Sequence, residues 1–256
     1  FNGARKHQKI EDDRFYYWAD KLGLLVWAEI GAAYEYNDQA VEEFSTQWLQ
    51  VVQDLYNHPS IICWVPFNES WGIEDVSHNK KQQNFTESIY YLTKSIDSQR
   101  PVIANDGWEH TISDIITFHD YVESTDKLRK TYIEDIKELL QNKKVFNDQE
   151  YIDGGKLIMA DNYQYQGQPI IFSEFGGIAF QNREGWGYGE QVETKEELSL
   201  RINKLMEIIR DADYFRGYCY TQLTDVEQEK NGLLDENREF KLDLEKIIEF
   251  NQIVEQ

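Results

Sequence analysis

The sequence is short of several features that would point to other classes of protein. Its apolar runs are all far shorter than the roughly 20 residues that a helix needs to cross a bilayer, and we identify no signal peptide. Cysteine occurs only twice in 256 residues, at Cys63 and Cys219, each inside an apolar strand-like run. We interpret both as buried thiols, which excludes a disulfide framework and a cysteine metal site.

Positive charge is also scarce. Lysine and arginine total 26 against 47 acidic residues, which gives a formal net charge of −21. Such a field repels phosphate backbones, so nucleic acid is not an expected partner. The sequence has no glycine-rich phosphate loop, and its histidines do not form a ligand set, because His58 and His78 are isolated and His110 and His119 have no partner motif. We therefore expect neither a cofactor nor a metal.

Aromatic residues are abundant, at 14% of the chain with seven Trp and sixteen Tyr. Two explanations fit this composition. The rings could fill an aromatic core, or some of them could form the flat apolar faces on which sugar rings lie. Composition alone does not separate the two.

Apolar runs of strand length alternate with longer amphipathic segments, which is typical of parallel βαβ units and an α/β fold. The spacing predicts strands over 1–7, 24–30, 60–67, 101–104, 115–118, 169–172 and 215–223. It predicts helices over 39–56, 83–96, 127–140, 194–210 and 241–254, with Thr194 as an N-cap.

The chain reads as one domain spanning 1–256, since we find neither a linker nor an internal repeat. Its length is typical of a (β/α)8 TIM barrel. Only about seven strands can be counted, and the sequence opens at Phe1 in what reads as the middle of an element. We therefore expect a barrel that lacks its first strand and helix and that belongs to a longer protein.

Two of the predicted strands deliver a glutamate at their carboxyl end. Glu69 follows the strand that closes at Phe67, and Glu174 follows the strand that closes at Phe172. In a parallel barrel these ends meet on the catalytic face. Two carboxylates on either side of a glycosidic bond are what acetal hydrolysis requires. A single such glutamate is most often a solvated loop residue, but a pair in Gly/Asn/Ser-rich surroundings favours catalysis.

The segments around both glutamates resemble those of a known family. Asn57-His58-Pro59-Ser60-Ile61-Ile62-Cys63-Trp64, closing on Asn68-Glu69-Ser70, resembles the acid/base signature of glycoside hydrolase family 2. Ile171-Phe172-Ser173-Glu174-Phe175-Gly176-Gly177 resembles the nucleophile segment of that family, and the stretches 2–7 and 17–29 are similar to it as well. The resemblance covers nearly the whole chain.

This resemblance implies a retaining exo-β-glycosidase built on a (β/α)8 barrel, with β-sandwich domains upstream that are absent here. It implies that Glu69 is the general acid/base and Glu174 the nucleophile. Asn68 is expected to hydrogen-bond the sugar 2-hydroxyl. Arg5 is expected to lie beneath Glu174 and keep it ionised, although a structural salt bridge is the alternative role for this arginine.

Further residues of the predicted site lie at other strand ends. His7 and His119 are candidates for sugar-hydroxyl contacts, with a structural histidine as the alternative, and Trp108 could line the site. A tyrosine that hydrogen-bonds the nucleophile is also implied by the resemblance. The candidates for it are Tyr121, Tyr163 and Tyr165.

The identity of the sugar is less constrained. Family members usually carry a tryptophan platform on the last strand, and Tyr220 takes that place here. We identify no Asn-x-Lys element of the kind that glucuronidases use for the sugar carboxylate. The missing Asn-x-Lys element favours a neutral sugar, chiefly a β-galactoside, while the tyrosine leaves the substrate class open, with a β-glucuronide or a β-mannoside as the alternatives.

Two other classes remain as alternatives. One is a non-catalytic carbohydrate-binding barrel, and the other is a metal-dependent barrel hydrolase. We expect a carbohydrate substrate, no nucleic-acid or membrane partner, any homo-oligomer to form through the absent domains, and a bacterial cytoplasmic or periplasmic location. We also expect the 256-residue portion to be inactive alone, because an open barrel exposes unpaired strand edges.

Overall fold

The computed structural model describes residues 1–145, 155–180 and 185–254. The chain divides into two compact units, the first formed by 1–118 and 157–169 and the second by 119–156 and 170–256. Each unit is built of parallel strands with helices, so the predicted α/β class is confirmed. In the described ranges, every helix is too short or too polar to cross a membrane.

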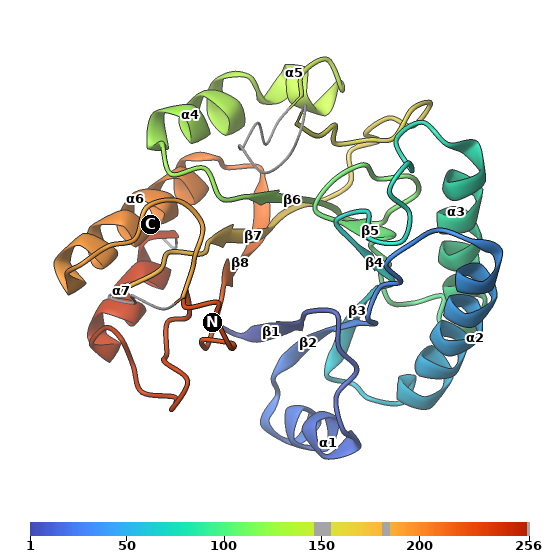
Figure 1. Cartoon of the computed structure of the whole chain (residues 1–256), viewed down its shortest axis with the longest axis horizontal. Helices are drawn as coiled ribbons and strands as arrows, with labels where there is room; N and C mark the ends of the chain where they lie inside the picture. The colour runs from blue at the N-terminus through green and yellow to red at the C-terminus, as the bar shows by residue number, and fades with distance from the viewer. Residues whose placement is uncertain (146–154, 181–184, 255–256) are drawn as a thin grey trace. The chain divides into compact units, whose positions relative to one another are not determined.

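The first unit contains two parallel sheets, one in the order β1-β2-β3 and one that pairs β4 with β5. The helices α2 and α3 pack side by side in this unit (Figure 1). Its elements are β1 (Gly3–Lys6), α1 (Asp13–Leu22), β2 (Leu25–Glu29), α2 (Asp38–Leu55), β3 (Ile61–Val65), β4 (Phe67–Asn68), α3 (Lys80–Ile96) and β5 (Asn105–Asp106).

Side-chain caps explain where the helices of this unit begin. Asp12, Asn37 and Asn79 each accept a hydrogen bond from a backbone amide in the first turn of α1, α2 and α3 respectively. The end of α1 falls at Gly23, whose φ of 75° is favourable for glycine. Helix α1 was not among the predicted elements, although its composition and caps are those of an ordinary amphipathic helix.

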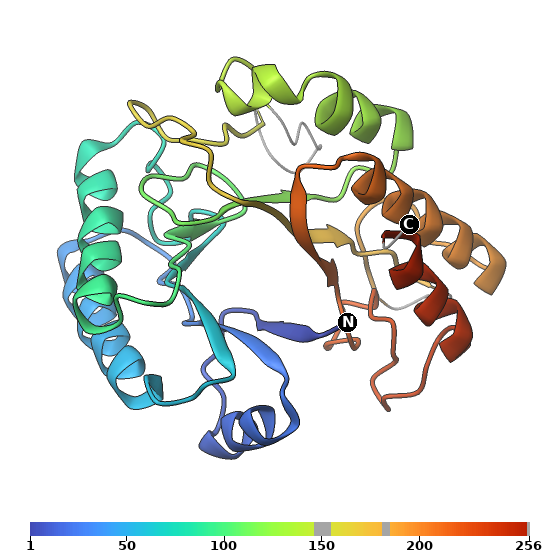
Figure 2. The same ribbon diagram turned by 180° about the vertical axis from the view of Figure 1, so that it is seen from behind.

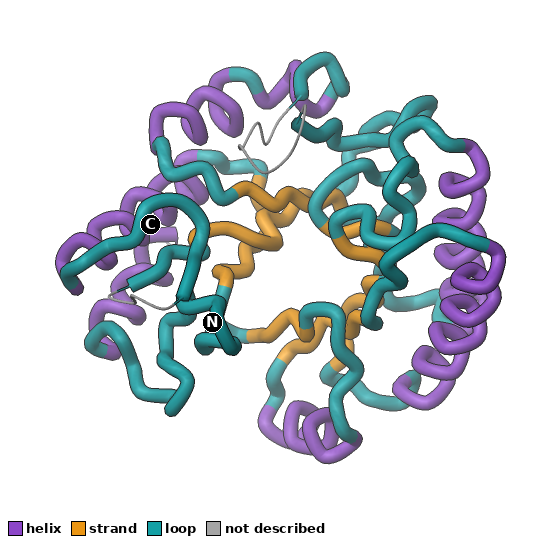
Figure 3. The backbone as a smooth tube through the Cα atoms, viewed as in Figure 1, coloured by secondary structure: helices purple, strands orange, loops and turns teal. Residues whose placement is uncertain are grey.

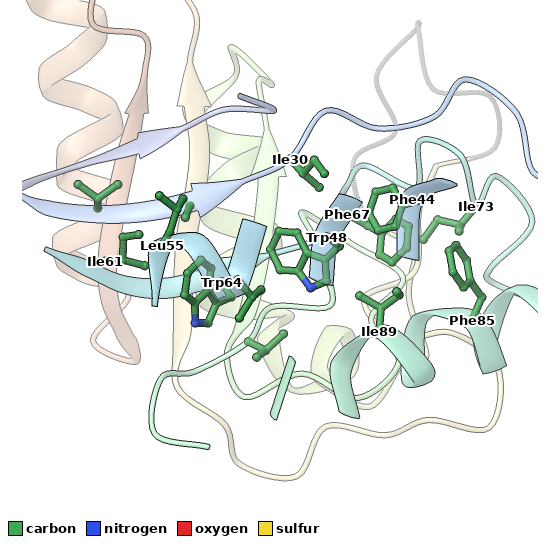
Figure 4. Close-up of a cluster of buried hydrophobic side chains, with 14 of the residues drawn as sticks. Ile30, Phe44, Trp48, Leu55, Ile61, Trp64, Phe67, Ile73, Phe85 and Ile89 are labelled. Atoms are coloured by element: carbon green, nitrogen blue, oxygen red, sulfur yellow. The ribbon is translucent and has the colours of Figure 1, made fainter. Parts of the chain in front are cut away.

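Aromatic and branched side chains fill the core of the first unit between its helices and strands (Figure 4). Trp48 and Trp64 are both fully buried, and each indole nitrogen has a partner, Thr93 Oγ1 at 2.7 Å and Asp97 Oδ2 at 2.9 Å. Phe44 stacks on other aromatic rings of the same cluster. Much of the aromatic content of this unit is therefore structural.

The second unit carries a sheet in the order β6-β7-β8, in which β7 and β8 are parallel. The helices α6 and α7 pack against each other beside it, as seen from both sides in Figures 1 and 2. Its elements are β6 (Ile116–Asp120, shared with the first unit), α4 (Thr125–Arg129), η1 (Lys130–Glu134), α5 (Ile136–Leu140), β7 (Ile170–Gly176), α6 (Lys195–Asp211), β8 (Phe215–Thr221) and α7 (Leu244–Val254).

Thr194 is the N-cap of α6, as predicted, and forms a full capping box with Glu197. The predicted helix over 127–140 is instead three short pieces, because η1 is a π turn between α4 and α5. Figure 3 shows this interruption in the secondary-structure colouring.

Three other expectations need correction. The predicted strand over 101–104 is reduced to a single bridge between Val102 and Trp64, and the chain forms β5 just after it. Cys63 is buried, and that burial raises the pKa of its thiol, but Cys219 is only half-buried. Glu174 lies inside β7 rather than after it, because the strand runs on to Gly176.

Candidate active site

Glu69 follows β4 in an unusual backbone conformation. Its φ is 51° and that of Ser70 is 60°, both in the left-handed region that non-glycine residues rarely adopt. Hydrogen bonds hold this turn in place, since the Glu69 amide donates to Asp106 O at 2.9 Å and the Ser70 amide to Asn105 Oδ1 at 3.0 Å. Non-glycine residues in this region cluster at functional sites. The turn fixes a half-buried carboxylate at the carboxyl end of a parallel strand.

A buried charge network lies at the carboxyl ends of the strands of the first unit. Arg5, from β1, forms ion pairs with Glu29 at the end of β2 and with Asp106 at the end of β5, the latter at 2.8 Å. The arginine side chain is 5% exposed and its two acidic partners are at most 1% exposed. A planar guanidinium suits such a site because it donates several hydrogen bonds in one plane.

Asn68 joins this network through its side-chain oxygen, which accepts a 2.6 Å hydrogen bond from Arg5 Nη2. Its side-chain nitrogen is buried and has no hydrogen-bond partner among the residues that the structure describes. Leaving a buried amide donor unsatisfied costs about 1–3 kcal/mol. Arg5 therefore fixes which end of the amide is the donor.

His7 and Trp108 occupy different surroundings in this unit. His7 lies just beyond β1 with its side chain 54% exposed, and its Nδ1 is 3.1 Å from Arg5 Nη2 and 3.5 Å from Glu29 Oε2. Trp108 is buried after β5, where its carbonyl accepts a hydrogen bond from Asn105. Both stand at strand ends, and His7 joins the charge network there.

In the second unit, Glu174 is held by two side chains from the end of β6. Glu174 is 7% exposed. The Tyr121 hydroxyl donates a hydrogen bond to Glu174 Oε2, and His119 Nδ1 lies 3.6 Å from the same oxygen. Both contacts are made by residues that the sequence singled out. They bind the carboxylate in one orientation.

The structure distinguishes between the three tyrosines that the sequence left open. Tyr121 contacts Glu174, whereas the Tyr163 hydroxyl hydrogen-bonds Glu87 and the Tyr165 hydroxyl donates to Gln168 O at 2.9 Å. Tyr163 and Tyr165 both belong to the first unit. Among the three, Tyr121 is therefore the residue that positions the candidate nucleophile.

Tyr220 lies on β8 and is 8% exposed. Its ring packs edge-on against Phe175 at 5.6 Å and lies so close to Gly176 that a β-carbon there would overlap it. Burial raises the pKa of the Tyr220 hydroxyl. The ring is thus fixed beside the strand that carries Glu174, and its role as a sugar platform stays a prediction.

Three residues that contact Arg5 or Tyr121 were not predicted from the sequence. Glu29 and Asp106 anchor Arg5, and both could have been found because each is an acidic residue at the end of an apolar run. The third is Tyr188, whose ring stacks on that of Tyr121. Its signal was the alternation of glycine and aromatic residues over 185–189.

Contrary to expectation, two Asn-x-Lys triplets do occur, beginning at Asn79 and Asn142. The lysine that ends the first, Lys81, pairs with Asp38 and is 67% exposed, and the lysine that ends the second, Lys144, pairs with Asp135. Neither triplet follows a strand, so neither is placed like a sugar-carboxylate site.

Comparison with known proteins shows which family and fold the chain resembles. The chain is 30% identical over 130 residues to a beta-glucuronidase of Bacteroides fragilis, a match that covers 45% of this chain and 18% of that protein. The fold is similar to a GH2 beta-galacturonidase from Eisenbergiella tayi bound to galacturonate (TM-score 0.69, 18% identity, 100% of this chain and 45% of that one). It is also similar to a beta-D-glucuronidase of Dictyoglomus thermophilum (TM-score 0.70, 16% identity, 100% and 45%).

The chain therefore spans less than half the length of these relatives. The similarity to the solved structures shows the fold, an α/β arrangement of the TIM-barrel kind. The family assignment rests on a match that covers more than half of the chain, because the family described as "Glycosyl hydrolases family 2, TIM barrel domain" matches residues 1–198. The chain belongs to glycosyl hydrolase family 2.

Proposed function

We propose that this chain is the catalytic portion of a retaining exo-β-glycosidase that uses Glu174 as nucleophile and Glu69 as general acid/base. The observation that carries the proposal is the setting of Glu174, a buried carboxylate in β7 that accepts a hydrogen bond from Tyr121 and lies near His119. A carboxylate held in this way is oriented for attack. Glu69 stands instead on a left-handed turn, where its carboxyl group is half-buried.

The reaction proceeds in two displacements. A Glu174 oxygen attacks the anomeric carbon while the carboxylic acid of Glu69 protonates the leaving oxygen, so the glycosidic bond breaks and an ester forms. Glu69, now a carboxylate, then removes a proton from water. The water oxygen attacks the anomeric carbon, the ester breaks, and Glu174 is released as a carboxylate with the sugar configuration retained.

The buried amide nitrogen of Asn68 supports a role in binding sugar. A hydroxyl next to the reacting carbon is an acceptor that would satisfy this donor. Arg5 fixes the orientation of the amide, so the donor is in place before the substrate arrives. The charge network of Arg5 therefore acts on the substrate through Asn68.

For the sugar, we propose a β-galactoside. The high negative charge of the chain disfavours an anionic sugar, and both Asn-x-Lys triplets are engaged in ion pairs away from strand ends. A β-uronide is the second candidate, favoured by the names of the relatives, which include a beta-glucuronidase and a beta-galacturonidase.

A matched set of 4-nitrophenyl glycosides tests both parts of the proposal in the full-length protein. Comparison of the β-galactoside with the β-galacturonide tests a hydroxymethyl group against a carboxylate at C6. The corresponding glucosides test the configuration at C4, and a mannoside tests the configuration at C2. We expect the highest kcat/KM for the galactoside. Higher activity on either uronide would mean that the substrate is a β-uronide and not a β-galactoside. Absence of activity on the whole set would contradict the assignment as an exo-β-glycosidase.

The covalent step has its own test. A 2-deoxy-2-fluoro glycoside with a good leaving group should inactivate the enzyme slowly, and mass spectrometry should find the sugar on the peptide that contains Glu174. Labelling of any other residue would overturn the assignment of the nucleophile.

A further inference from the structure

The segment Gly185-Trp186-Gly187-Tyr188-Gly189 places an aromatic ring against the tyrosine that holds Glu174. The rings of Tyr188 and Tyr121 are stacked with centroids 3.6 Å apart and planes 5° apart. The hydroxyl of Tyr121 donates to Glu174. All three residues belong to the second unit. The Tyr188 ring therefore contacts the Tyr121 ring, and the Tyr121 hydroxyl in turn contacts the Glu174 carboxylate.

The alternating sequence explains how this segment reaches its position. Tyr188 N donates to Gly177 O at 2.8 Å, and a β-carbon at Gly187 would lie 2.6 Å from both Gly177 O and Ala179 N. The segment thus runs against the backbone that directly follows β7, and glycine is needed for that approach. Gly177 itself has a φ of 58°, and a β-carbon there would overlap the Tyr188 ring.

A second backbone contact fixes the other side of the segment. Trp186 N donates to Gln228 O at 2.8 Å, and Trp186 O accepts from Lys230 N at 2.8 Å. The Trp186 ring packs edge-on against Tyr188, at 5.6 Å and 84°. Main-chain hydrogen bonds of both Tyr188 and Trp186 therefore fix the segment, and the Trp186 ring packs on Tyr188, which holds the Tyr188 ring in place.

We propose that Tyr188 is a positioning residue, which acts on Glu174 only through Tyr121 by fixing the plane of the Tyr121 ring. The proposal rests on the function proposed above for Glu174. A tyrosine ring has two soft torsions, and a stacked neighbour restricts both. Since a hydrogen bond weakens steeply with misalignment, a freed ring would donate less well to the carboxylate.

The test uses a double-mutant cycle in the full-length protein. Tyr188→Ala removes the stacked ring, and Tyr188→Phe keeps that ring. Tyr121→Phe removes the hydroxyl that contacts Glu174. His119, whose Nδ1 lies 3.6 Å from Glu174 Oε2, is retained in every variant. The first measurement is the acidic limb of the pH profile of kcat/KM, which reports ionisation of the free enzyme.

Losing a hydrogen bond to the ionised form raises the apparent pKa of a carboxyl group. We expect Tyr188→Ala to move the acidic limb upward by about one pH unit and to lower kcat/KM about tenfold. Tyr188→Phe should leave the limb in place. In the Tyr121→Phe background, Tyr188→Ala should cause no further shift, because its effect has no other route.

Two results would overturn the proposal. A further shift in the double variant would mean that Tyr188 acts on Glu174 directly. A shift in Tyr188→Phe as large as in Tyr188→Ala would mean that the hydroxyl, and not the stacked ring, is responsible.

A measurement without turnover separates this proposal from the proposed function. In protein carrying ¹³C-labelled glutamate, the carboxyl carbon of Glu174 can be titrated by NMR and assigned by its disappearance in Glu174→Gln. Its pKa should rise in Tyr188→Ala and not in Tyr188→Phe. An unchanged titration in Tyr188→Ala would refute the positioning role even if the enzyme is active. A protein inactive on every glycoside would refute the function and leave this readout intact.

Discussion

The surroundings of the two candidate catalytic carboxylates differ. Near Glu69, the side chains of Arg5, Glu29 and Asp106 form a buried charge network that orients the neighbouring Asn68. Around Glu174 the contacts are aromatic, because Tyr121 donates a hydrogen bond to the carboxylate and is itself stacked on another ring. In the proposed reaction Glu69 gains and loses a proton, whereas Glu174 attacks carbon. Different variants are therefore informative around Glu69 and around Glu174.

The largest expected effect comes from replacing Glu174. Glu174→Gln replaces the proposed nucleophilic carboxylate by a neutral amide, which is a poor nucleophile, so kcat should fall by about 10⁴-fold or more. Steady-state kinetics on the best nitrophenyl glycoside measures the loss. Circular dichroism and a thermal melt should show an unchanged fold. Residual activity within tenfold of the wild type would mean that another group is the nucleophile.

Glu69→Ala should have an effect that depends on the leaving group. Substrates with poor leaving groups need protonation, so their rates should fall by about 10²–10⁴-fold, while activated aryl glycosides should still form the glycosyl-enzyme. Azide, which needs no general base, should then restore turnover and give a β-glycosyl azide, identified by NMR. If azide gives a β-glycosyl azide with Glu174→Ala instead, the two carboxylates have exchanged roles.

The charge network predicts a loss of stability on the Glu69 side. Glu29→Gln breaks one buried ion pair of Arg5, so the free energy of unfolding should fall by about 3 kcal/mol, at the low end for buried pairs since Asp106 remains. Urea denaturation measures it.

The matched control for that variant is Glu249→Gln. It removes a pair with Lys246 whose two side chains are 50% and 53% exposed, and it should cost far less stability than Glu29→Gln because solvent screens an exposed pair. Equal losses in the two variants would show that burial of the network does not matter.

The smallest predicted effect concerns pH. Burial raises the pKa of Asp97, but hydrogen bonds from Trp64 and Arg100 outweigh it and lower the pKa to about 2 from 3.8. A lowered folded pKa stabilises the protein above pH 3.8, and this stabilisation is lost as pH falls through about 2. The difference in unfolding free energy between wild type and Asp97→Asn should therefore shrink by about 2 kcal/mol between pH 5 and pH 2. A difference that is constant over this range would contradict the shift.

Much of the fold could be predicted because hydrophobic period and caps are local. The predicted boundaries of α2 and α6 agree with the observed ones to within a residue or two. Asn37 and Thr194 are N-caps of a recognisable type at the start of these helices. The strand at 101–104 failed because its apolar residues pack in the core without pairing along their length. An apolar run indicates burial, and burial alone does not specify a ladder of hydrogen bonds.

The candidate site was predictable where it depends on strand ends and less so where it depends on tertiary contacts. Glu69 follows β4 and Arg5 lies near the end of β1, as the sequence predicts, whereas Glu174 lies inside β7. Tyr188 was not predicted, because it lies in an irregular segment, far in sequence from Tyr121, and its stacking depends on close backbone approach. Glycines that alternate with aromatic residues are a usable sign of such approach, and this alternation can be recognised in the amino-acid sequence alone.

The π turn between α4 and α5 has a consequence for insertions and deletions. Asp135 N donates to Lys130 O, five residues back, so this turn contains one residue more than an α-helical turn. The extra residue lets Tyr132 enter the interior and donate to Asp120 Oδ2, directly before Tyr121. Deleting one residue there would leave an ordinary α-helical turn, with Leu139 still directed into the interior. Aligned with a relative whose helix is regular, this chain should show a single-residue insertion at this point.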